Sequence, residues 1–153
     1  MTDQTASPAT AAPASDAAAP AADVVRARLE EIYANDPAVR SHGITLGEAS
    51  EGHVTMHRDV TADMVNSHEI CHGGFLFHLA DSALAYCVAT YGDTPVTRRA
   101  DITYVASARL GTSLTATARE NAEFGRDRVI EVRVDADGEL VAYFTGQATS
   151  PRR

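Results

Sequence analysis

One carboxylate stands alone in an otherwise apolar segment. Residues 73–91 read "GGFLFHLADSALAYCVATY", and Asp81 is the only acidic residue among them. An ionised group is costly to bury unless it is paired, so Asp81 requires a partner or a function. Partial desolvation would make this carboxylate a stronger base, able to activate water or to attack an electrophile. A structural role, in which a hydroxyl group or an arginine satisfies a buried Asp81, is equally open.

Two glycines precede this carboxylate by about two helical turns. Gly73 and Gly74 stand at the predicted helix start, where backbone N–H groups lack partners within the helix and the helix dipole favours negative charge. Because glycine has no side chain, a ligand can approach the backbone closely. A carbonyl oxygen bound there would be polarised, as in an oxyanion hole. A glycine pair can also serve only tight packing, so this signal is weak by itself.

The predicted helix is apolar on two sides. At 100° per residue, one broad face carries Phe75, Leu76, Leu79, Ala80, Ala83 and Cys87. The opposite side carries Gly74, Phe77, Asp81, Ala85 and Val88. A sheet can cover one side, and a second subunit is the simplest cover for the other. The pattern therefore predicts a dimer with Asp81 near its interface.

The segments around this helix predict an α+β domain. Asp23 is a candidate N-cap for a first helix that ends at Asn35-Asp36-Pro37. Two alternating runs around Glu51-Gly52 predict a β-hairpin, and a polar loop then leads into the helix at 73–91. After residue 95 the apolar period becomes two, in four β-rich segments at 96–106, 112–120, 128–134 and 139–149. This order predicts one curved antiparallel sheet around a dominant helix.

Composition sets the outer limits of the domain. Residues 1–23 are nearly all Ala, Pro, Ser, Thr and Asp, which predicts a disordered tail, followed by a folded domain at 24–150 and a short tail at 151–153. The tail lacks the basic start and apolar run of a signal peptide, and we expect no membrane span. The formal net charge of −8 argues against non-specific binding to nucleic acid or to an anionic membrane. Two cysteines without export signals predict free thiols and a cytoplasmic protein.

The loop and the helix together form a long motif. Residues 66–81 follow the pattern N-x-H-x-x-C-H-G-G-x-L-F-x-L-A-D, which resembles the signature of hotdog-fold acyl-CoA thioesterases and is nearest to the phenylacetate-degradation PaaI subfamily. The segments "YANDPAVRSHGI" and "LTATA" extend the resemblance to roughly residues 24–149. It implies a hotdog fold, an antiparallel sheet wrapped around a long central helix. It also implies homodimers with the active site between subunits, usually assembled into homotetramers.

The resemblance assigns roles to four motif residues. Asp81 corresponds to the catalytic carboxylate, as general base or nucleophile, and the Gly73 N–H to the donor that polarises the thioester carbonyl. Asn66 corresponds to the loop residue that holds water or substrate, and His72 to the histidine beside the thioester. The implied reaction is hydrolysis of phenylacetyl-CoA, or of a ring-hydroxylated relative, to free acid and CoA. CoA is part of the substrate, so no cofactor is expected.

Substrate contacts are predicted less directly. Gly74 would admit the ligand to the backbone, and an aromatic acyl pocket could draw on Phe75, Phe77, Tyr86, Tyr104 and Phe124, all of which could equally be core. Relatives often carry Arg or Lys before Pro-Gly after the strand that follows the helix, whereas residues 106–108 here are Ala-Ser-Ala. Candidates to replace that basic residue at the CoA phosphates are Arg98, Arg99, Arg109, Arg126 and Arg128. Each of them alone is more simply a solvated residue at a strand edge.

Several alternatives stay open. The substrate could be a short- or medium-chain aliphatic acyl-CoA, the chain could bind acyl-CoA without turnover, or Asp81 and His72 could serve a hydroxyacyl-thioester dehydratase. His68, Cys71 and His72 with His53 and His57 raise the question of zinc, but about four converging ligands are needed, so no metal is expected. Cys71 is interpreted as structural rather than as a nucleophile.

Overall fold

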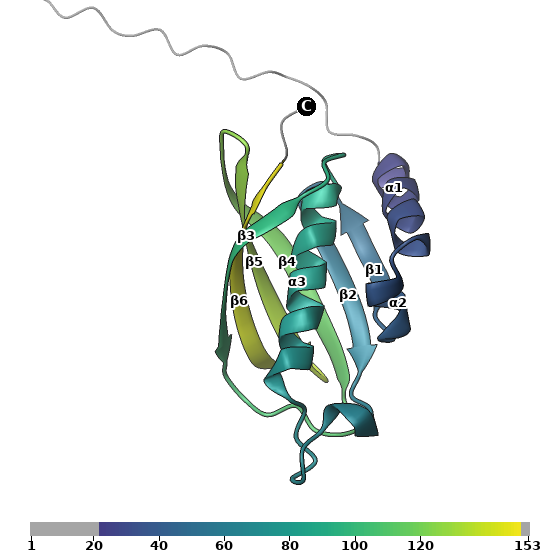
Figure 1. The fold of residues 1–153 in the computed structure, drawn as a ribbon, viewed down its shortest axis with the longest axis vertical. Coiled ribbons are helices and arrows are strands. Elements are labelled where there is room, and N and C mark those ends of the chain that lie inside the picture. Colours follow the sequence, from purple (N-terminus) through teal and green to yellow (C-terminus); the bar gives the residue numbers. More distant parts are fainter. Residues whose placement is uncertain (1–21, 151–153) are drawn as a thin grey trace, which may run out of the picture.

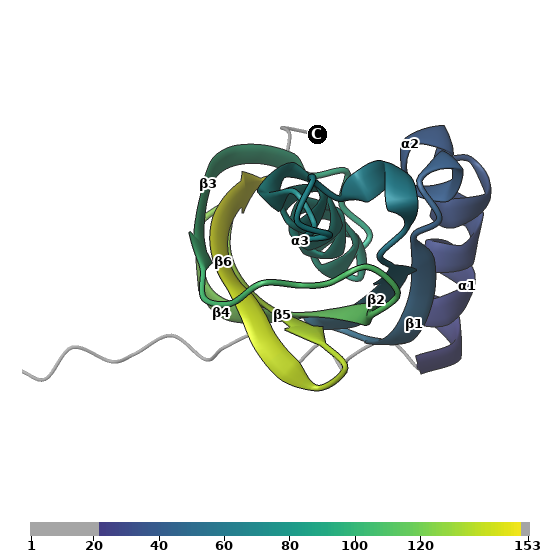
Figure 2. The same ribbon diagram turned by 90° about the horizontal axis from the view of Figure 1, so that it is seen from below.

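The computed structural model describes residues 22–150, which form one curved sheet around a long helix. The sheet has six antiparallel strands in the order β1-β2-β4-β5-β6-β3, and Figures 1 and 2 show it curling around α3. The helices are α1 (Ala22–Ala34), α2 (Pro37–Ser41), a 3-10 turn at Ala62–Met64, and α3 (Gly73–Ala89). The strands are β1 (Thr45–Ser50), β2 (His53–Asp59), β3 (Val96–Tyr104), β4 (Ser113–Phe124), β5 (Asp127–Ala136) and β6 (Glu139–Thr149).

Helix α3 provides one wall of the core, and the concave face of the sheet provides the other. On the helix, Leu76, Leu79, Ala80, Ala83, Leu84 and Cys87 are at most 3% exposed. Inward-facing residues of β2, β4, β5 and β6, among them Val54, Leu114, Val132 and Phe144, pack against them. The predicted sheet-facing side is confirmed except for Phe75, which is half-buried.

The opposite side of α3 is only partly covered. Gly74 is exposed, and Phe77, Asp81 and Ala85 are half-buried, whereas Val88 is fully buried, contrary to its predicted place on the open side. The last turn of α3 is enclosed, whereas the first turns are not. The open side is therefore a patch around the first two turns and Asp81.

An N-terminal helical arm packs beside the sheet (Figure 2). Helix α1 begins at Ala22, so Asp23 lies in the first turn, and the prediction that it is the N-cap is wrong. The break at Asn35-Asp36-Pro37 is confirmed, but it starts a second short helix that the sequence did not reveal. Asp36 caps that helix by accepting a hydrogen bond from the Val39 N–H at 3.1 Å, and it also accepts one from the Tyr86 hydroxyl at 3.2 Å. These bonds tie the arm to α3.

Strand β3 is an edge of the sheet. It pairs only with β6, and Val96, Tyr104 and Val105 along it and just beyond its end are 46–53% exposed. An exposed apolar edge strand offers unpaired backbone groups to another chain. This edge borders the open side of α3.

The remaining predictions about organisation fall partly outside the described residues. The hairpin predicted at Glu51-Gly52 is confirmed. Of the predicted tail at 1–23, only Ala22 and Asp23 are described, and the tail at 151–153 lies wholly outside. Within residues 22–150, no helix combines the length and apolar character needed to cross a membrane.

Candidate active site

The N-terminus of α3 is free to accept a ligand. His72 occupies the N-cap position but makes no side-chain capping bond, and the first turn carries no acidic residue. Among the described residues, nothing accepts a hydrogen bond from the N–H of Gly73 or Gly74. A Cβ on Gly73 would lie 2.6 Å from the Tyr104 ring, whereas one on Gly74 would meet nothing within 4 Å. Glycine at 73 therefore lets Tyr104 lie against the helix start, and both N–H donors remain unused.

A cavity of about 220 Å³ lies beside Gly73. It is lined by Ile70, Cys71, Gly73, Leu76, Tyr104 and residues 106–108. Its wall is mostly apolar, and the loop that follows β3 is held against it because the Cys71 N–H donates to the Ala108 carbonyl at 2.9 Å. Residues 106–108, where the expected basic residue is missing, thus form a wall of this cavity.

Asn66 and His72 flank the helix start. The Asn66 Oδ1 accepts hydrogen bonds from the N–H of His68 at 2.9 Å and of Ile70 at 3.2 Å, so this side chain shapes the loop. Its amide nitrogen donates to no other described residue and is the atom left for a ligand. His72 is exposed beside the helix start, and its backbone N–H donates to the Met64 carbonyl at 2.9 Å.

Asp81 is half-buried on the open side of α3. Its only hydrogen bond within residues 22–150 comes from the Thr97 hydroxyl, at 3.3 Å. One long hydrogen bond is weak satisfaction for a carboxylate, which can accept about four. Asp81 follows Gly73 by eight residues, so the two are about 12 Å apart along the helix axis. The Gly73 N–H and the Asp81 carboxylate of one chain therefore cannot act on the same carbonyl group.

The aromatic candidates separate into different environments. Tyr104 lines the cavity. Phe77 packs edge-on against Phe144 with ring centroids 5.4 Å apart. Tyr86 is 2% exposed and belongs to the core, while Phe124 is 52% exposed where β4 ends, far along the chain from the helix start. The cavity therefore uses one of the five aromatic residues considered.

Comparisons with known proteins identify the family of this chain. Residues 68–142 match the model of the thioesterase superfamily. Acyl-coenzyme A thioesterase PaaI of Escherichia coli is 34% identical over 118 residues, which are 76% of this chain and 84% of the relative. The chain belongs to the thioesterase superfamily.

Solved structures extend the match to the whole domain. The structure of E. coli PaaI superposes with a TM-score of 0.83 at 30% identity, covering 86% of this chain and 96% of that one. A variant of the phenylacetic acid degradation protein PaaI from Thermus thermophilus superposes with a TM-score of 0.72 at 32% identity, covering 76% of this chain and 100% of the other. The predicted hotdog fold is confirmed, and the chain is a thioester hydrolase.

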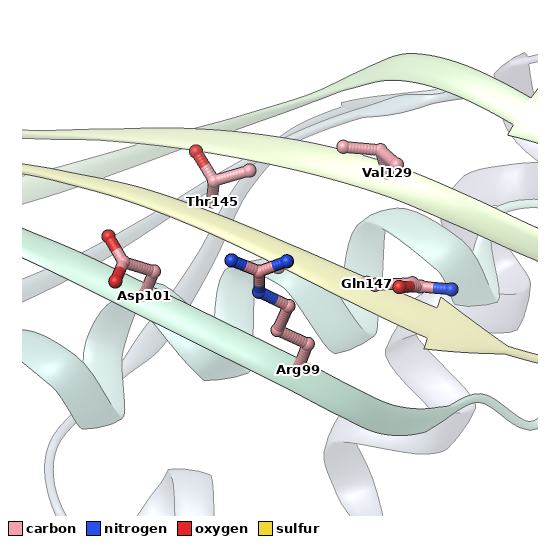
Figure 3. Close-up of a pocket in the computed structure, with 6 residues that line it drawn as sticks. Arg99, Asp101, Val129, Thr145 and Gln147 are labelled. Atoms are coloured by element: carbon pink, nitrogen blue, oxygen red, sulfur yellow. The ribbon is translucent and has the colours of Figure 1, made fainter.

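The five arginines that are candidates for binding the CoA phosphates lie at different parts of the thioesterase. Arg98 and Arg109 are exposed. Arg99 lies on the outer face of the sheet, away from α3, in a shallow pocket with Asp101, Thr145 and Gln147 (Figure 3). Arg126 lies at the β4–β5 turn, where it donates to the Ser150 carbonyl at 3.3 Å. None of these four forms an ion pair within residues 22–150, so they stay candidates for the CoA phosphates.

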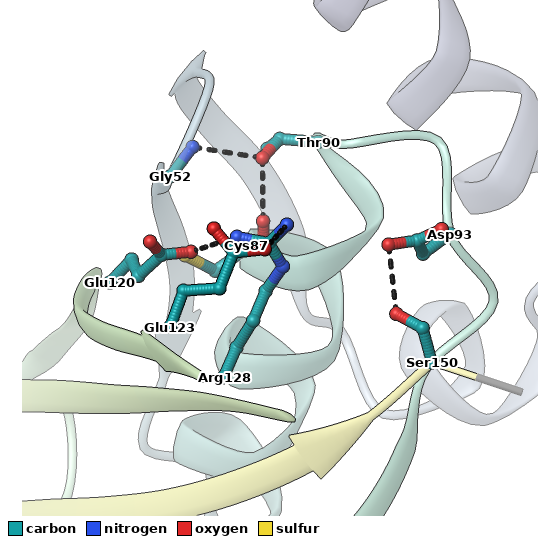
Figure 4. A network of polar contacts seen from close by, with 8 residues as sticks. All are labelled: Gly52, Cys87, Thr90, Asp93, Glu120, Glu123, Arg128 and Ser150. Carbon is teal, nitrogen blue, oxygen red and sulfur yellow. Dashed lines mark hydrogen bonds and ion pairs between the residues drawn. The ribbon is translucent and has the colours of Figure 1, made fainter. Parts of the chain in front are cut away.

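Arg128 is already engaged. Its guanidinium forms ion pairs with Glu120 at 2.6 Å and Glu123 at 2.9 Å (Figure 4). It also lies 3.6 Å above the centre of the Tyr91 ring. Burial lowers its pKa, but the two glutamates outweigh that effect and hold the pKa above its ordinary value. We therefore leave Arg128 out of the proposed CoA contacts.

The histidines and Cys71 show structural contacts. His53 Nδ1 lies 3.1 Å from the Ala118 carbonyl, and His57 Nδ1 lies 3.0 Å from the Thr115 hydroxyl. Among residues 22–150, no three His, Cys, Asp or Glu side chains gather in a metal-binding arrangement. Burial raises the pKa of the Cys71 thiol, more than Arg58 lowers it, so the reactive thiolate is disfavoured.

Sequence reasoning missed Arg58. Its side chain is 6% exposed, points to the inside of the sheet and reaches the first turn of α3, where its Cζ lies 5.1 Å from the centre of the Phe75 ring. The signal was present in the sequence: Val54, Met56 and Arg58 alternate on the buried face of β2. An arginine at the third position of such a series should have been recognised as a buried charge.

Proposed function

We propose that this thioesterase hydrolyses acyl-CoA thioesters, with a phenylacetyl or hydroxylated aryl-acetyl group as the first candidate. The observation that carries the proposal is the pair of unused N–H donors at Gly73 and Gly74 beside an apolar cavity of about 220 Å³. The E. coli relative is named an acyl-coenzyme A thioesterase, and the Tyr104 ring in the cavity wall suits an aromatic acyl group. The reaction needs no cofactor, because CoA enters as part of the substrate.

The chemistry follows from charge development on the carbonyl. The thioester oxygen accepts a hydrogen bond from the Gly73 N–H, where the α3 dipole stabilises the negative charge that forms during attack. Asp81 either takes a proton from a water that attacks the carbonyl carbon, or attacks that carbon itself to form a mixed anhydride that water then hydrolyses to the free acid. In both routes the C–S bond breaks and the CoA sulfur leaves as a thiolate. Asn66 would orient the water or the substrate through its free amide, and His72 would stand beside the thioester.

The proposed site requires two subunits. Because Gly73 and Asp81 of one helix are about 12 Å apart, Asp81 would come from a second copy whose α3 runs antiparallel across the interface. The open side of α3 and the exposed β3 edge, with Val96, Tyr104 and Val105, supply apolar surface for that contact. We propose a homodimer assembled further into a homotetramer, in the cytoplasm, where both cysteines would stay reduced.

The first test compares wild type with Asp81→Asn on a panel of aryl- and alkyl-CoA thioesters. Asparagine keeps the shape of the side chain and removes the base, so we expect free-thiol release to fall by about two or more orders of magnitude. The preferred ester separates the aromatic from the aliphatic candidates. Binding of the esters by wild type without any thiol release would instead favour a binding protein or a dehydratase.

A second test addresses the shared site. Asp81→Asn and Gly73→Val chains are each expected to be inactive, but a mixed dimer would contain one site with intact Gly73 and intact Asp81. Random mixing by co-refolding should recover up to about a quarter of wild-type activity, since half of the dimers are mixed and each has one intact site. Failure to recover activity in dimers verified as mixed would place both groups of a site in one chain.

A further inference from the structure

Arg58 is a buried charge without a partner. The residue is 6% exposed, and its Nη1 is enclosed without a hydrogen bond. None of the ion pairs within residues 22–150 includes it. Its contact with the Phe75 ring, 5.1 Å from Cζ, offsets part of the loss of water but does not replace the missing acceptor. A native structure rarely leaves such a donor unused unless another molecule supplies the acceptor.

The surroundings of Arg58 are short of negative charge. His78 on α3 and His42 beyond α2 stack edge-on with ring centroids 4.9 Å apart. Burial lowers the pKa of His78, so its ring is neutral at pH 7 and supplies no negative charge to Arg58. The nearest carboxylate that acts on Arg58 is Asp63, which is exposed and accepts a hydrogen bond from the Thr61 hydroxyl at 2.6 Å. The positive end of the α3 dipole adds to the imbalance. An anion would therefore be favoured next to Arg58.

This region adjoins the cavity beside Gly73. Cys71 lines that cavity, and Arg58 is the charged group that acts on the Cys71 thiol. Phe75, which lies under the guanidinium, follows Gly73 by two residues, so Arg58 faces a position within about one helical turn, or 5.4 Å along the axis, of the thioester carbonyl. Arg58 is not among the residues that line this cavity, so an acyl group that starts at Gly73 would have to extend past Cys71 to approach the guanidinium.

We propose that Arg58 is a specificity-determining residue that binds a carboxylate at the far end of the acyl group, so that the preferred substrates are CoA thioesters of dicarboxylic acids. The inference rests on the proposed function, because it places the thioester at Gly73. The acyl carboxylate accepts hydrogen bonds from the guanidinium and supplies the negative charge that the fold leaves out. A neutral acyl group of the same size fills the same space but leaves Arg58 unpaired.

The assignment also explains why an unpaired charge is kept in the core. Removing a buried donor that has no partner relieves a desolvation penalty, so an apolar replacement should stabilise the empty protein. We expect Arg58→Met to raise the melting temperature by roughly 2 to 4 °C. A purely structural arginine would give the opposite sign. Stability that is given up at a binding residue is a common trade-off.

The test uses two matched pairs of esters. Glutaryl-CoA is compared with 5-methylhexanoyl-CoA, which has methyl groups in place of the carboxylate oxygens, and 4-carboxyphenylacetyl-CoA with 4-hydroxyphenylacetyl-CoA. In wild type we expect kcat/KM for each carboxylate ester to exceed that of its partner. In Arg58→Met the ratio within each pair should fall about 10- to 100-fold, with a smaller fall in Arg58→Lys. The matched control is Arg119→Met, an exposed arginine on the outer face of β4, which should leave both ratios unchanged.

The outcomes separate this inference from the proposed function. In one outcome the neutral esters are turned over, and the ratio of kcat/KM for each carboxylate ester to that of its neutral partner is at or below one and does not change in Arg58→Met. This outcome overturns the inference but leaves the proposed thioesterase function intact. If Arg58 raises kcat/KM only for 4-hydroxyphenylacetyl-CoA, the inference is also overturned, because the group that accepts from the guanidinium would then be neutral. If no ester is turned over, the shift in melting temperature on adding glutaryl-CoA decides: a shift present in wild type and lost in Arg58→Met supports the site, and equal shifts in both contradict it.

Discussion

The two ends of helix α3 treat their polar groups in opposite ways. At the N-terminal end, the N–H groups of Gly73 and Gly74 and the Arg58 guanidinium have no partners within residues 22–150. At the C-terminal end, the Thr90 hydroxyl and the Arg128 guanidinium both have partners. The fully buried Thr90 hydroxyl donates to the Cys87 carbonyl at 2.6 Å and accepts from the Gly52 N–H at 2.9 Å (Figure 4).

The buried arginines at the two ends of α3 differ in the same way. Arg128, at the C-terminal end, has two glutamates and the Tyr91 ring, whereas Arg58 has only the Phe75 ring. Unmet hydrogen-bonding capacity is costly, so its concentration at one end marks the place where a ligand is to bind. The satisfied end holds the helix in the sheet. One helix therefore combines a binding end with an anchoring end.

The largest expected effect is at the binding end. Gly73→Ala puts a Cβ 2.6 Å from the Tyr104 ring, which is 51% exposed and can swing away. The fold should survive, but the cavity wall and the carbonyl position would shift, and a misplacement of about 1 Å costs about 100-fold in rate. Steady-state kinetics on the preferred ester measure this. A rate within about threefold of wild type would mean that the helix start does not position the thioester.

The anchoring end should respond in stability instead. Arg128→Met leaves Glu120 half-buried and unpaired, and we expect the free energy of unfolding to fall by about 2 kcal/mol. Denaturant unfolding measures the loss. Arg133→Met is the matched control, because its pair with Asp135 is exposed on the arginine side, and its loss should be much smaller than that of Arg128→Met. Equal losses in the two variants would erase the distinction between the two ends.

A smaller loss is expected at Thr90. Thr90→Val keeps the shape of the side chain but removes the hydroxyl, which leaves the Gly52 N–H without its acceptor. We expect the free energy of unfolding to fall by about 1 to 2 kcal/mol, with kcat/KM for the preferred ester unchanged. A fall in rate without a fall in stability would contradict the anchoring role.

The smallest expected effect is on the pH dependence of stability, and it comes from His78 at the binding end. Burial, then His42 and Arg58, lower the pKa of His78 below 6.5, against smaller opposing effects of Asp81 and Asp36. The unfolded chain then binds more protons than the folded one near pH 6, so stability should fall as the pH drops from about 7 through the lowered pKa. His78→Gln should flatten this part of the pH–stability curve. An unchanged slope would mean that folding does not lower the pKa of His78.

Local patterns predicted most of the scaffold. The apolar run and its glycine start located α3 to within two residues of its observed end, and the period-two segments located the strands. Strands β4 and β5 extend beyond the predicted segments to a turn at Gly125, because their outer halves pair with each other and are mostly exposed. The short helix α2 was missed although its start signal is local, because Asp36 at the N-cap and Pro37 at the first helical position were interpreted only as a break in the first helix.

The sequence by itself determined the α+β class, the motif at residues 66–81 whose resemblance implied the hotdog fold, and the isolation of Asp81, because these depend on residue types and on their spacing along the chain. Only the tertiary structure decided which polar groups have partners. Arg58 and Arg128 look alike in the sequence, yet one is unpaired at the cavity and the other is held by two glutamates. Such differences arise from contacts between strands and helices distant along the chain, which no local pattern encodes.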